Sequence, residues 1–182
     1  MKATGIVRRI DDLGRVVVPK EIRRTLRIRE GDPMEIFTNR EGEIILKKYS
    51  PIGEIDSFAK QYAESLAQVS GCRIVISDRD QVIAIAGGAK KELMGKNIST
   101  QLEKIINNRK SFIVENNSEK CISLVDGVEF KCSGQVIYPI LCEGDIIGSV
   151  IIMPKNEEQD VSDTEQKLAS VAALFLGRQM EA

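Results

Sequence analysis

The sequence predicts an α+β protein with two domains, a β-rich module of about fifty residues followed by a larger α/β/α sandwich around an antiparallel sheet. Three observations support this prediction. A cluster of Ser, Pro and Gly at residues 50–53 breaks the chain. The part before it is rich in short β-branched runs, and the part after it predicts elements in the order α-β-β-α-β-β-β-β-α. We therefore expect a domain at residues 1–50, a linker at 51–55 and a second domain at 56–182.

The first domain consists of short predicted strands joined by turns. The strands are expected at residues 4–10, 15–18, 34–38 and 43–48. Residues 11–14 and 30–33 combine Asp with Gly, which is typical of turns. Pro19 ends the second strand and suits the first position of a helix over residues 20–26, because the N–H that proline lacks is not needed there.

The apolar runs of the first domain exceed what one copy can bury. Residues 16–18 and 44–46 are continuously apolar, as in strands that are covered on both faces. A module of this size seldom buries enough apolar surface to be stable alone. We therefore expect an obligate homodimer in which two chains interlace into one β-barrel. The side chains expected to hold that barrel are Leu13, Val17, Ile22, Leu26 and Ile36.

The sequence of the second domain predicts a sheet that lies between helices. Its strands are expected at residues 72–78, 81–86, 112–115, 121–125, 134–141 and 146–153. A first helix carries apolar residues at helical spacing and ends at Gly71, and a second covers residues 99–107. Ser162 and Glu165 have the spacing of a capping box, so the last helix is expected to begin there.

The last helix has more apolar residues than one narrow core-facing stripe needs. They are Leu168, Leu174, Phe175, Leu176 and Met180. The excess favours packing of part of this helix against another chain. Dimers are therefore expected to pair into a homotetramer through the C-terminal helices.

The composition argues against an enzyme or a metalloprotein. The chain has no histidine, which removes the commonest general base, and its four cysteines have no CxxC spacing. We expect no catalytic residue, no metal and no resident cofactor. No apolar signal core follows the first residues, and no apolar run is long enough to cross a bilayer, so the expected location is the cytoplasm, on the nucleoid.

Positive charge is concentrated at one end of the chain. Residues 1–29 hold nine Lys/Arg and three acids, a net charge of +6, whereas the whole chain has a net charge of −1. Seven of the nine cations are arginines, whose forked guanidinium suits phosphate and guanine. This separation predicts a polyanion-binding site in the first domain.

The predicted helix at residues 20–27 presents its cations on one side, within an arc of about 100°. These cations are Lys20, Arg23, Arg24 and Arg27. The alternative is a solvated surface helix, but such helices usually interleave acids, and here only Glu21 interrupts the cations. The pattern therefore favours contact with nucleic acid.

Three further arginines precede this helix: Arg8, Arg9 and Arg15. By strand alternation Arg8 shares a face with Ile6 and Ile10, while Arg9 faces the other way. The spacing alone leaves open which of these two points at the partner.

The run GIVRRIDDLGRVVVPKEIRRTLRIREGDPMEIF resembles the AbrB-type swapped-hairpin DNA-binding domain of bacterial transition-state regulators. The elements D-x-L-G-R-V-V-V-P, E-I-R-R-T-L and G-D-P-M-E-I occur in that family's order and spacing. The resemblance covers about residues 1–50. Because a second domain follows directly, the whole chain resembles the stage V sporulation protein T family, which joins this domain to a C-terminal GAF-like domain.

The resemblance implies a regulator of transcription in sporulation, acting as activator or repressor, in which two chains interleave hairpins into a barrel. It implies that Arg8, Arg15, Arg23 and Arg24 face double-stranded DNA. Local charge adds Lys20 and Arg9, and also Lys2. The resemblance also implies recognition of DNA shape more than of a strict base sequence, which suits a flat cationic surface.

The role of the GAF-like domain stays open between binding an unidentified small-molecule effector and holding subunits together. Gly87 and Gly88, followed by Lys90 and Lys91, could cradle an anion or form a plain turn. Two alternatives concern the whole chain: an antitoxin of a toxin–antitoxin pair with the same N-terminal fold, and a small-molecule sensor in which DNA binding is secondary. Antitoxins usually end in a short disordered tail, whereas some 130 residues with regular periodicity follow here.

Overall fold

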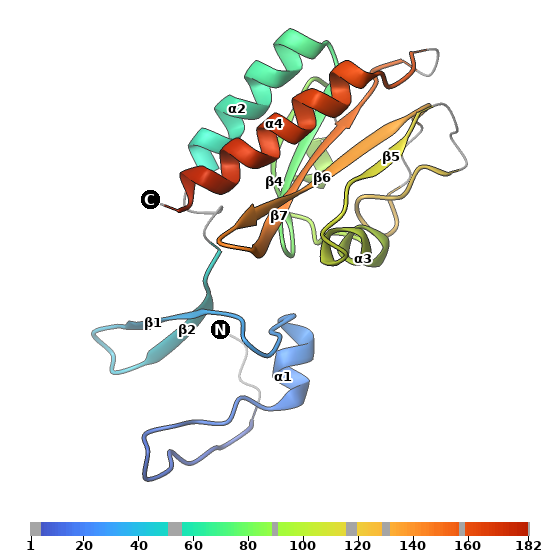
Figure 1. Ribbon diagram of the computed structural model, residues 1–182. Helices are drawn as coiled ribbons and strands as arrows, with labels where there is room; N and C mark the ends of the chain where they lie inside the picture. The colour runs from blue at the N-terminus through green and yellow to red at the C-terminus, as the bar shows by residue number, and fades with distance from the viewer. Residues whose placement is uncertain are drawn as a thin grey trace. The chain divides into compact units, whose positions relative to one another are not determined.

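The computed structural model describes residues 5–50, 56–88, 91–115, 120–128, 132–156 and 159–181. The chain divides into two compact units, Met1–Tyr49 and Ser50–Ala182. Each unit has its own sheet, and each is described by itself (Figure 1).

The described residues of the first unit form one short helix and one hairpin. Helix α1 (Lys20–Thr25) follows Pro19, and strands β1 (Met34–Thr38) and β2 (Ile44–Lys48) pair antiparallel with Ile36 opposite Leu46. The side-chain oxygen of Asn39 accepts hydrogen bonds from the backbone N–H of Glu41 and Glu43, which closes the turn between the strands. The predicted hairpin is confirmed.

The two strands predicted before α1 are not formed within the single chain. Residues 5–10 and 15–18 have no assigned secondary structure, and one backbone hydrogen bond, from Asp11 N–H to the Arg15 carbonyl at 3.0 Å, joins their ends. A strand needs a neighbouring strand to satisfy its backbone groups. The sequence prediction is therefore wrong for the isolated chain, which supplies no neighbour for these segments.

Much of the apolar surface of the first unit is uncovered. The side chains of Leu13, Val17 and Ile36 are 70%, 72% and 70% exposed, and Leu26 is 59% exposed. All four are among the residues expected to hold the barrel of a dimer, and the single chain leaves them uncovered. So many exposed apolar side chains in so small a unit normally mark a contact with another molecule.

The second unit is an α/β/α sandwich. Its five strands form one antiparallel sheet in the order β4-β3-β7-β6-β5. The strands are β3 (Arg73–Asp78), β4 (Val82–Ala86), β5 (Phe112–Val114), β6 (Gln135–Cys142) and β7 (Asp145–Met153). The helices are α2 (Asp56–Ser70), α3 (Thr100–Asn107) and α4 (Asp163–Gln179), with a 3-10 turn at Lys91–Leu93.

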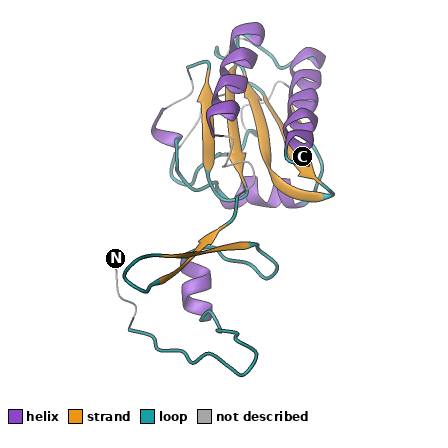
Figure 2. Ribbon diagram, turned by 90° about the vertical axis from the view of Figure 1, so that its left-hand side faces the viewer, coloured by secondary structure: helices purple, strands orange, loops and turns teal. Residues whose placement is uncertain are grey.

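Helices cover both faces of this sheet (Figures 1 and 2). Helices α2 and α4 lie side by side on one face, and α3 lies on the other. Neighbouring residues of β3 alternate between the two cores: Ile74 and Ile76 pack under α2 and α4, and Val75 packs on the α3 side. A sheet that is buried on both faces explains why its central strands are almost continuously apolar.

Helix α4 packs directly on β6. A Cβ atom built on Gly177 would lie 2.0 Å from the Leu141 carbonyl oxygen, so this position admits no side chain. At its start, Ser162 N–H donates to a Glu165 carboxylate oxygen at 2.8 Å, which confirms the predicted capping box. Burial opposes ionisation of Glu165, but the hydrogen bonds from Ser162 outweigh it and lower the pKa of this carboxyl.

The strand predicted at residues 121–125 is not formed, because side chains take the place of a neighbouring strand. The Gln135 amide accepts from Ile122 N–H at 3.0 Å and donates to the Ile122 carbonyl at 3.2 Å. The Ser99 hydroxyl, which caps α3, donates to the Ser123 carbonyl at 2.5 Å. This segment is thus fixed to β6 and α3 by polar side chains.

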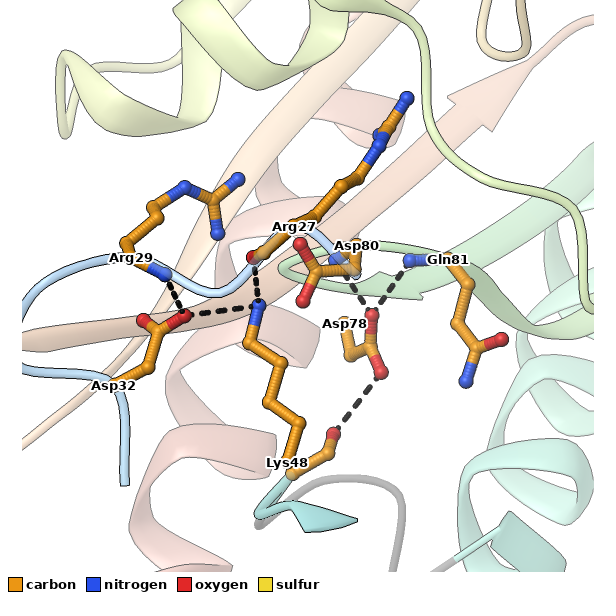
Figure 3. Close-up of polar contacts among 8 residues, drawn as sticks. Arg27, Arg29, Asp32, Lys48, Asp78, Asp80 and Gln81 are labelled. Atoms are coloured by element: carbon orange, nitrogen blue, oxygen red, sulfur yellow. Dashed lines mark hydrogen bonds and ion pairs between the residues drawn. The ribbon is translucent and has the colours of Figure 1, made fainter. Parts of the chain in front are cut away.

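The buried Asp78 holds the start of the second unit against the turn after β3. One of its oxygens accepts from the backbone N–H of Asp80 and Gln81, both at 2.7 Å, and the other accepts from the Ser50 hydroxyl at 3.0 Å (Figure 3). Burial raises the pKa of Asp78, and these hydrogen bonds offset the increase only in part.

The raised pKa of Asp78 predicts a pH-dependent contribution to stability. The folded state binds this proton more tightly than the unfolded state, so the free energy of unfolding falls as the pH rises from the ordinary value of 3.8 through the raised value. Asp78→Asn keeps an oxygen for the two backbone donors and removes the charge. The variant should therefore gain stability relative to the wild type as the pH rises over this range, measured by urea unfolding at a series of pH values. Replacement of the exposed Asp126 by Asn is the matched control, and a difference for Asp78→Asn that does not vary with pH would contradict this account.

Candidate nucleic-acid interface

Helix α1 carries three of the six predicted contact residues: Lys20, Arg23 and Arg24. Lys20 and Arg24 are exposed, and Arg23 is half-buried. A helix of six residues is not stable by itself and depends on what holds its ends. At its start Pro19 is buried, and after its end Ile28 N–H returns to the Arg23 carbonyl at 2.8 Å.

The chain leaving α1 is fixed by a charged contact with the hairpin (Figure 3). The Lys48 ammonium, on β2, donates to the Arg27 carbonyl at 2.8 Å and lies 3.0 Å from a carboxylate oxygen of Asp32. The same oxygen accepts from Arg29 N–H at 2.8 Å. The Asp32 side chain is only 2% exposed, so its charge needs these partners. This contact fixes the exit of α1 relative to β2.

Arg27 does not join the cationic face of α1. The helix ends at Thr25, and Arg27 has a left-handed backbone, with φ of 52°. The predicted arc of four cations is therefore reduced to the three that α1 contains.

Arg15 is positioned by Asp11. One carboxylate oxygen of Asp11 accepts from the backbone N–H of Leu13 at 3.0 Å and of Arg15 at 2.8 Å, and the other accepts from Arg15 Nε at 2.8 Å. Gly14 completes the turn with φ of +75°, which favours glycine. Backbone and side-chain hydrogen bonds from Arg15 lower the pKa of Asp11. The contact uses Nε and leaves the Arg15 side chain 70% exposed.

The remaining cations are available for a ligand. Arg8 and Arg9 are exposed on the segment before this turn. Within the described parts of the chain, no acid forms an ion pair with Arg8, Arg9, Lys20, Arg23 or Arg24. Lys2 lies outside the described residues.

Three residues that shape this region were not among the predicted site residues: Asp11 and Asp32, which were predicted only as parts of turns, and Lys48. Asp11 had a local signal, an Asp three residues before a Gly and four before an Arg, which is typical of a side chain that closes a turn. The contact between Lys48 and Asp32 joins residues distant in the sequence and has no such signal.

Among the described residues of the second unit, no group of three or more His, Cys, Asp or Glu could hold a metal ion. A Cβ on Gly87 would lie 1.9 Å from the Cys72 carbonyl oxygen, so close backbone packing accounts for this glycine. In the described part of the chain, no helix has the length and apolar character needed to cross a membrane.

Similarity to known proteins shows the family to which this chain belongs. The family model described as stage V sporulation protein T C-terminal, transcription factor, matches residues 54–181. Stage V sporulation protein T of Bacillus subtilis strain 168 is 52% identical over 181 residues, covering 100% of this chain and 99% of the relative. The chain belongs to the stage V sporulation protein T family. This family consists of transcription factors, and the match confirms the resemblance that the sequence motifs indicated.

The first unit has relatives of its own. The transition state regulatory protein AbrB of Bacillus subtilis strain 168 is 63% identical over 51 residues, which cover 28% of this chain and 52% of AbrB. A second family model, described as antidote-toxin recognition MazE, bacterial antitoxin, matches residues 7–54. The predicted AbrB-type domain is thus confirmed.

Solved structures share the fold of the second unit. A segment of a methyl-accepting chemotaxis protein has a TM-score of 0.58 and 18% identity, covering 70% of this chain and 93% of that one. The GAF domain of an Acinetobacter phosphoenolpyruvate-protein phosphotransferase has a TM-score of 0.54 and 15% identity, covering 71% and 87%. At these identities the likeness concerns fold alone, and it confirms the predicted GAF-like architecture.

The contact between Asp11 and Arg15 predicts a measurable titration. Asp11 should titrate below the ordinary value of 3.8, and its contribution to stability should be lost as the pH falls through that lowered pKa. Arg15→Ala removes the side-chain hydrogen bond but keeps the backbone one, so the pKa of Asp11 should move part of the way back toward 3.8. Carboxyl chemical shifts followed by NMR measure both values. Arg24→Ala is the control and should leave the Asp11 titration unchanged; an equal change in both variants would rule out a specific contact.

Proposed function

We propose that a homodimer of this chain binds double-stranded DNA and thereby regulates transcription of genes used in sporulation. The DNA contacts are made by Arg8, Arg15, Arg23 and Arg24, with Arg9 and Lys20 adding to the surface. The observation that carries the proposal is the concentration of cations in the first unit. Five of them have no acidic partner in the described chain, and of these only Arg23 is half-buried while the other four are exposed. Cations that are not neutralised internally are available to phosphates.

The uncovered apolar surface supports the dimer. Leu13, Val17 and Ile36 are exposed in one chain, and a second copy with interlaced hairpins would cover them and supply a neighbour for residues 5–10 and 15–18. A two-fold axis would also double the cationic surface and match the pseudo-two-fold symmetry of a DNA duplex.

The proposed mechanism combines positioning with recognition of DNA shape. Arg23 and Arg24 on the short helix and Arg15 in the turn contact phosphates and groove edges, and Asp11 holds Arg15 ready for this contact. Phosphate contacts give affinity without base specificity, so selectivity depends on the shape and flexibility of the duplex. Binding releases counterions, and affinity should therefore fall steeply with salt.

We further propose that the second unit pairs two dimers into a homotetramer. Val171 and Leu174 on α4 are 61% and 58% exposed, and Phe175 beside them stacks on Tyr62 of α2 with ring centroids 5.3 Å apart. Exposed aliphatic side chains next to an ordered aromatic cluster suit a contact with a second copy. A small-molecule effector is the alternative role for this unit. Aliphatic side chains fill the space between α3 and the sheet of this unit, and this favours association of chains over binding of an effector.

Arg15→Ala and Arg24→Ala are the test of the DNA contacts. Each should weaken binding by about 1 to 3 kcal/mol for every arginine–DNA interaction that the substitution removes. Each should also reduce the slope of log affinity against log salt by about 1 for every phosphate that is no longer neutralised. A salt-titrated binding assay with full-length protein measures both effects, and circular dichroism checks that each variant is folded.

Arg40→Ala is the matched control, because Arg40 is an exposed arginine of the same unit in the turn between β1 and β2. It should leave affinity and slope nearly unchanged. Equal losses for Arg40→Ala and Arg15→Ala would mean that general charge, and not these positions, determines binding.

Leu174→Glu tests the proposed tetramer. A charge at this exposed position should prevent association of dimers, so size-exclusion chromatography with light scattering should give tetramers for the wild type and dimers for the variant. Gln179→Glu, at an exposed polar position of the same helix, should leave tetramers intact. Only dimers of the wild type at micromolar concentration would exclude this assembly.

A further inference from the structure

Two of the four cysteines lie next to each other in the second unit. The Cys121 thiol donates to the Cys132 carbonyl oxygen at 3.5 Å. The Gln135 amide holds the two segments together, because it bonds both the N–H and the carbonyl of Ile122. The chain around Cys121 is therefore kept beside the chain that leads into β6.

The two thiols differ in exposure. Cys121 is half-buried, whereas Cys132 is 4% exposed. The other two cysteines contact different parts of the unit: Cys72 donates to the Ser70 carbonyl and Cys142 to the Met180 carbonyl. The unit thus contains one thiol pair and two separate thiols, all of them free.

The pKa of the Cys132 thiol also reflects its proximity to Cys121. Burial raises the pKa of the Cys132 thiol, and a hydrogen bond with the Cys121 side chain and the charge of the Cys121 thiolate contribute to the increase. A thiol whose pKa is raised above its ordinary value stays protonated near neutral pH and reacts slowly with oxidants. Cys121 is the member of the pair that an oxidant can reach first.

We propose that Cys121 and Cys132 are an oxidisable thiol pair that a hydroperoxide converts into an intramolecular disulfide. In the first step the Cys121 thiolate attacks hydrogen peroxide, an S–O bond forms as the O–O bond breaks, and one water leaves after protonation. In the second step the Cys132 sulfur attacks the Cys121 sulfenic acid, the S–S bond forms, and hydroxide leaves with the Cys132 proton as a second water. The two thiols lose two electrons and the peroxide gains them.

The disulfide would add a covalent bond to the hydrogen bonds that hold the Cys121 segment beside the chain leading into β6. This segment borders the core between α3 and the sheet. Leu124 and Val125 of the bridged segment pack in that core, and the Ser123 carbonyl accepts from the Ser99 hydroxyl at the start of α3. Oxidation would therefore fix the position of this segment against β6.

Mass spectrometry of the full-length protein tests the pair. Cys142→Ser is the background, because trypsin cleaves after Lys120 and Lys131 and would otherwise leave Cys132 and Cys142 in one peptide. After hydrogen peroxide and alkylation, the free thiols should fall from three to one, and the peptides 121–131 and 132–155 should be disulfide-linked. Retention of all three thiols, or links between chains on a non-reducing gel, would overturn the proposal.

Single replacements separate the two roles. Cys132→Ser should leave Cys121 as a sulfenic acid that dimedone traps, and Cys121→Ser should leave Cys132 unoxidised at the same peroxide concentration. Cys72→Ser, which removes a buried thiol outside the pair, should form the disulfide as the wild type does. Oxidation of Cys132 in the absence of Cys121, or loss of the disulfide in Cys72→Ser, would contradict the assignment.

Discussion

The first unit has more apolar surface than its own chain can cover. This constraint determines how the unit must associate and how its cations are brought together. Residues 5–10 and 15–18 have the composition of strands but find no neighbour within the chain, and Val17 is left 72% exposed. A monomer in this state would be marginal and prone to aggregate. Association of two copies removes both problems together, and it also brings two sets of cations onto one molecule. Folding and DNA binding in this unit are therefore inseparable from its oligomeric state.

Charge is distributed so that only one unit attracts a polyanion. The first 29 residues have a net charge of +6 while the whole chain has −1, so the residues after Arg29 are acidic overall. An acidic second unit would repel a duplex that approached it and leave the basic unit as the productive site of encounter. A bulk isoelectric point near 5.7 gives no indication of this arrangement.

Local signals in the sequence predicted local structure, and non-local contacts escaped prediction. The capping box of Ser162 and Glu165 and the hairpin at residues 34–48 were predicted correctly because all their determinants lie within a few residues. The strand predicted at 121–125 failed because the Gln135 side chain takes the place of a neighbouring strand. Charge spacing indicated a cationic region in the first unit, and the family resemblance selected Arg8, Arg15, Arg23 and Arg24 within it. The buried Asp32 that fixes the exit of α1, and the meeting of Cys121 with Cys132, depend on chain segments that only the fold brings together.

The first unit alone does not determine what the chain does, since an antitoxin model and a transition-state regulator both match it. The difference lies after residue 50. An antitoxin would use a tail that orders on its partner, and such a tail has too little apolar content to form a core. Here α2 and α4 cover one face of a five-stranded sheet and α3 covers the other, and Gly177 permits α4 to approach β6 at backbone contact. A segment that has already buried its apolar residues in its own core is not free to wrap a toxin, whereas its exposed α4 surface remains suited to joining copies of the same chain.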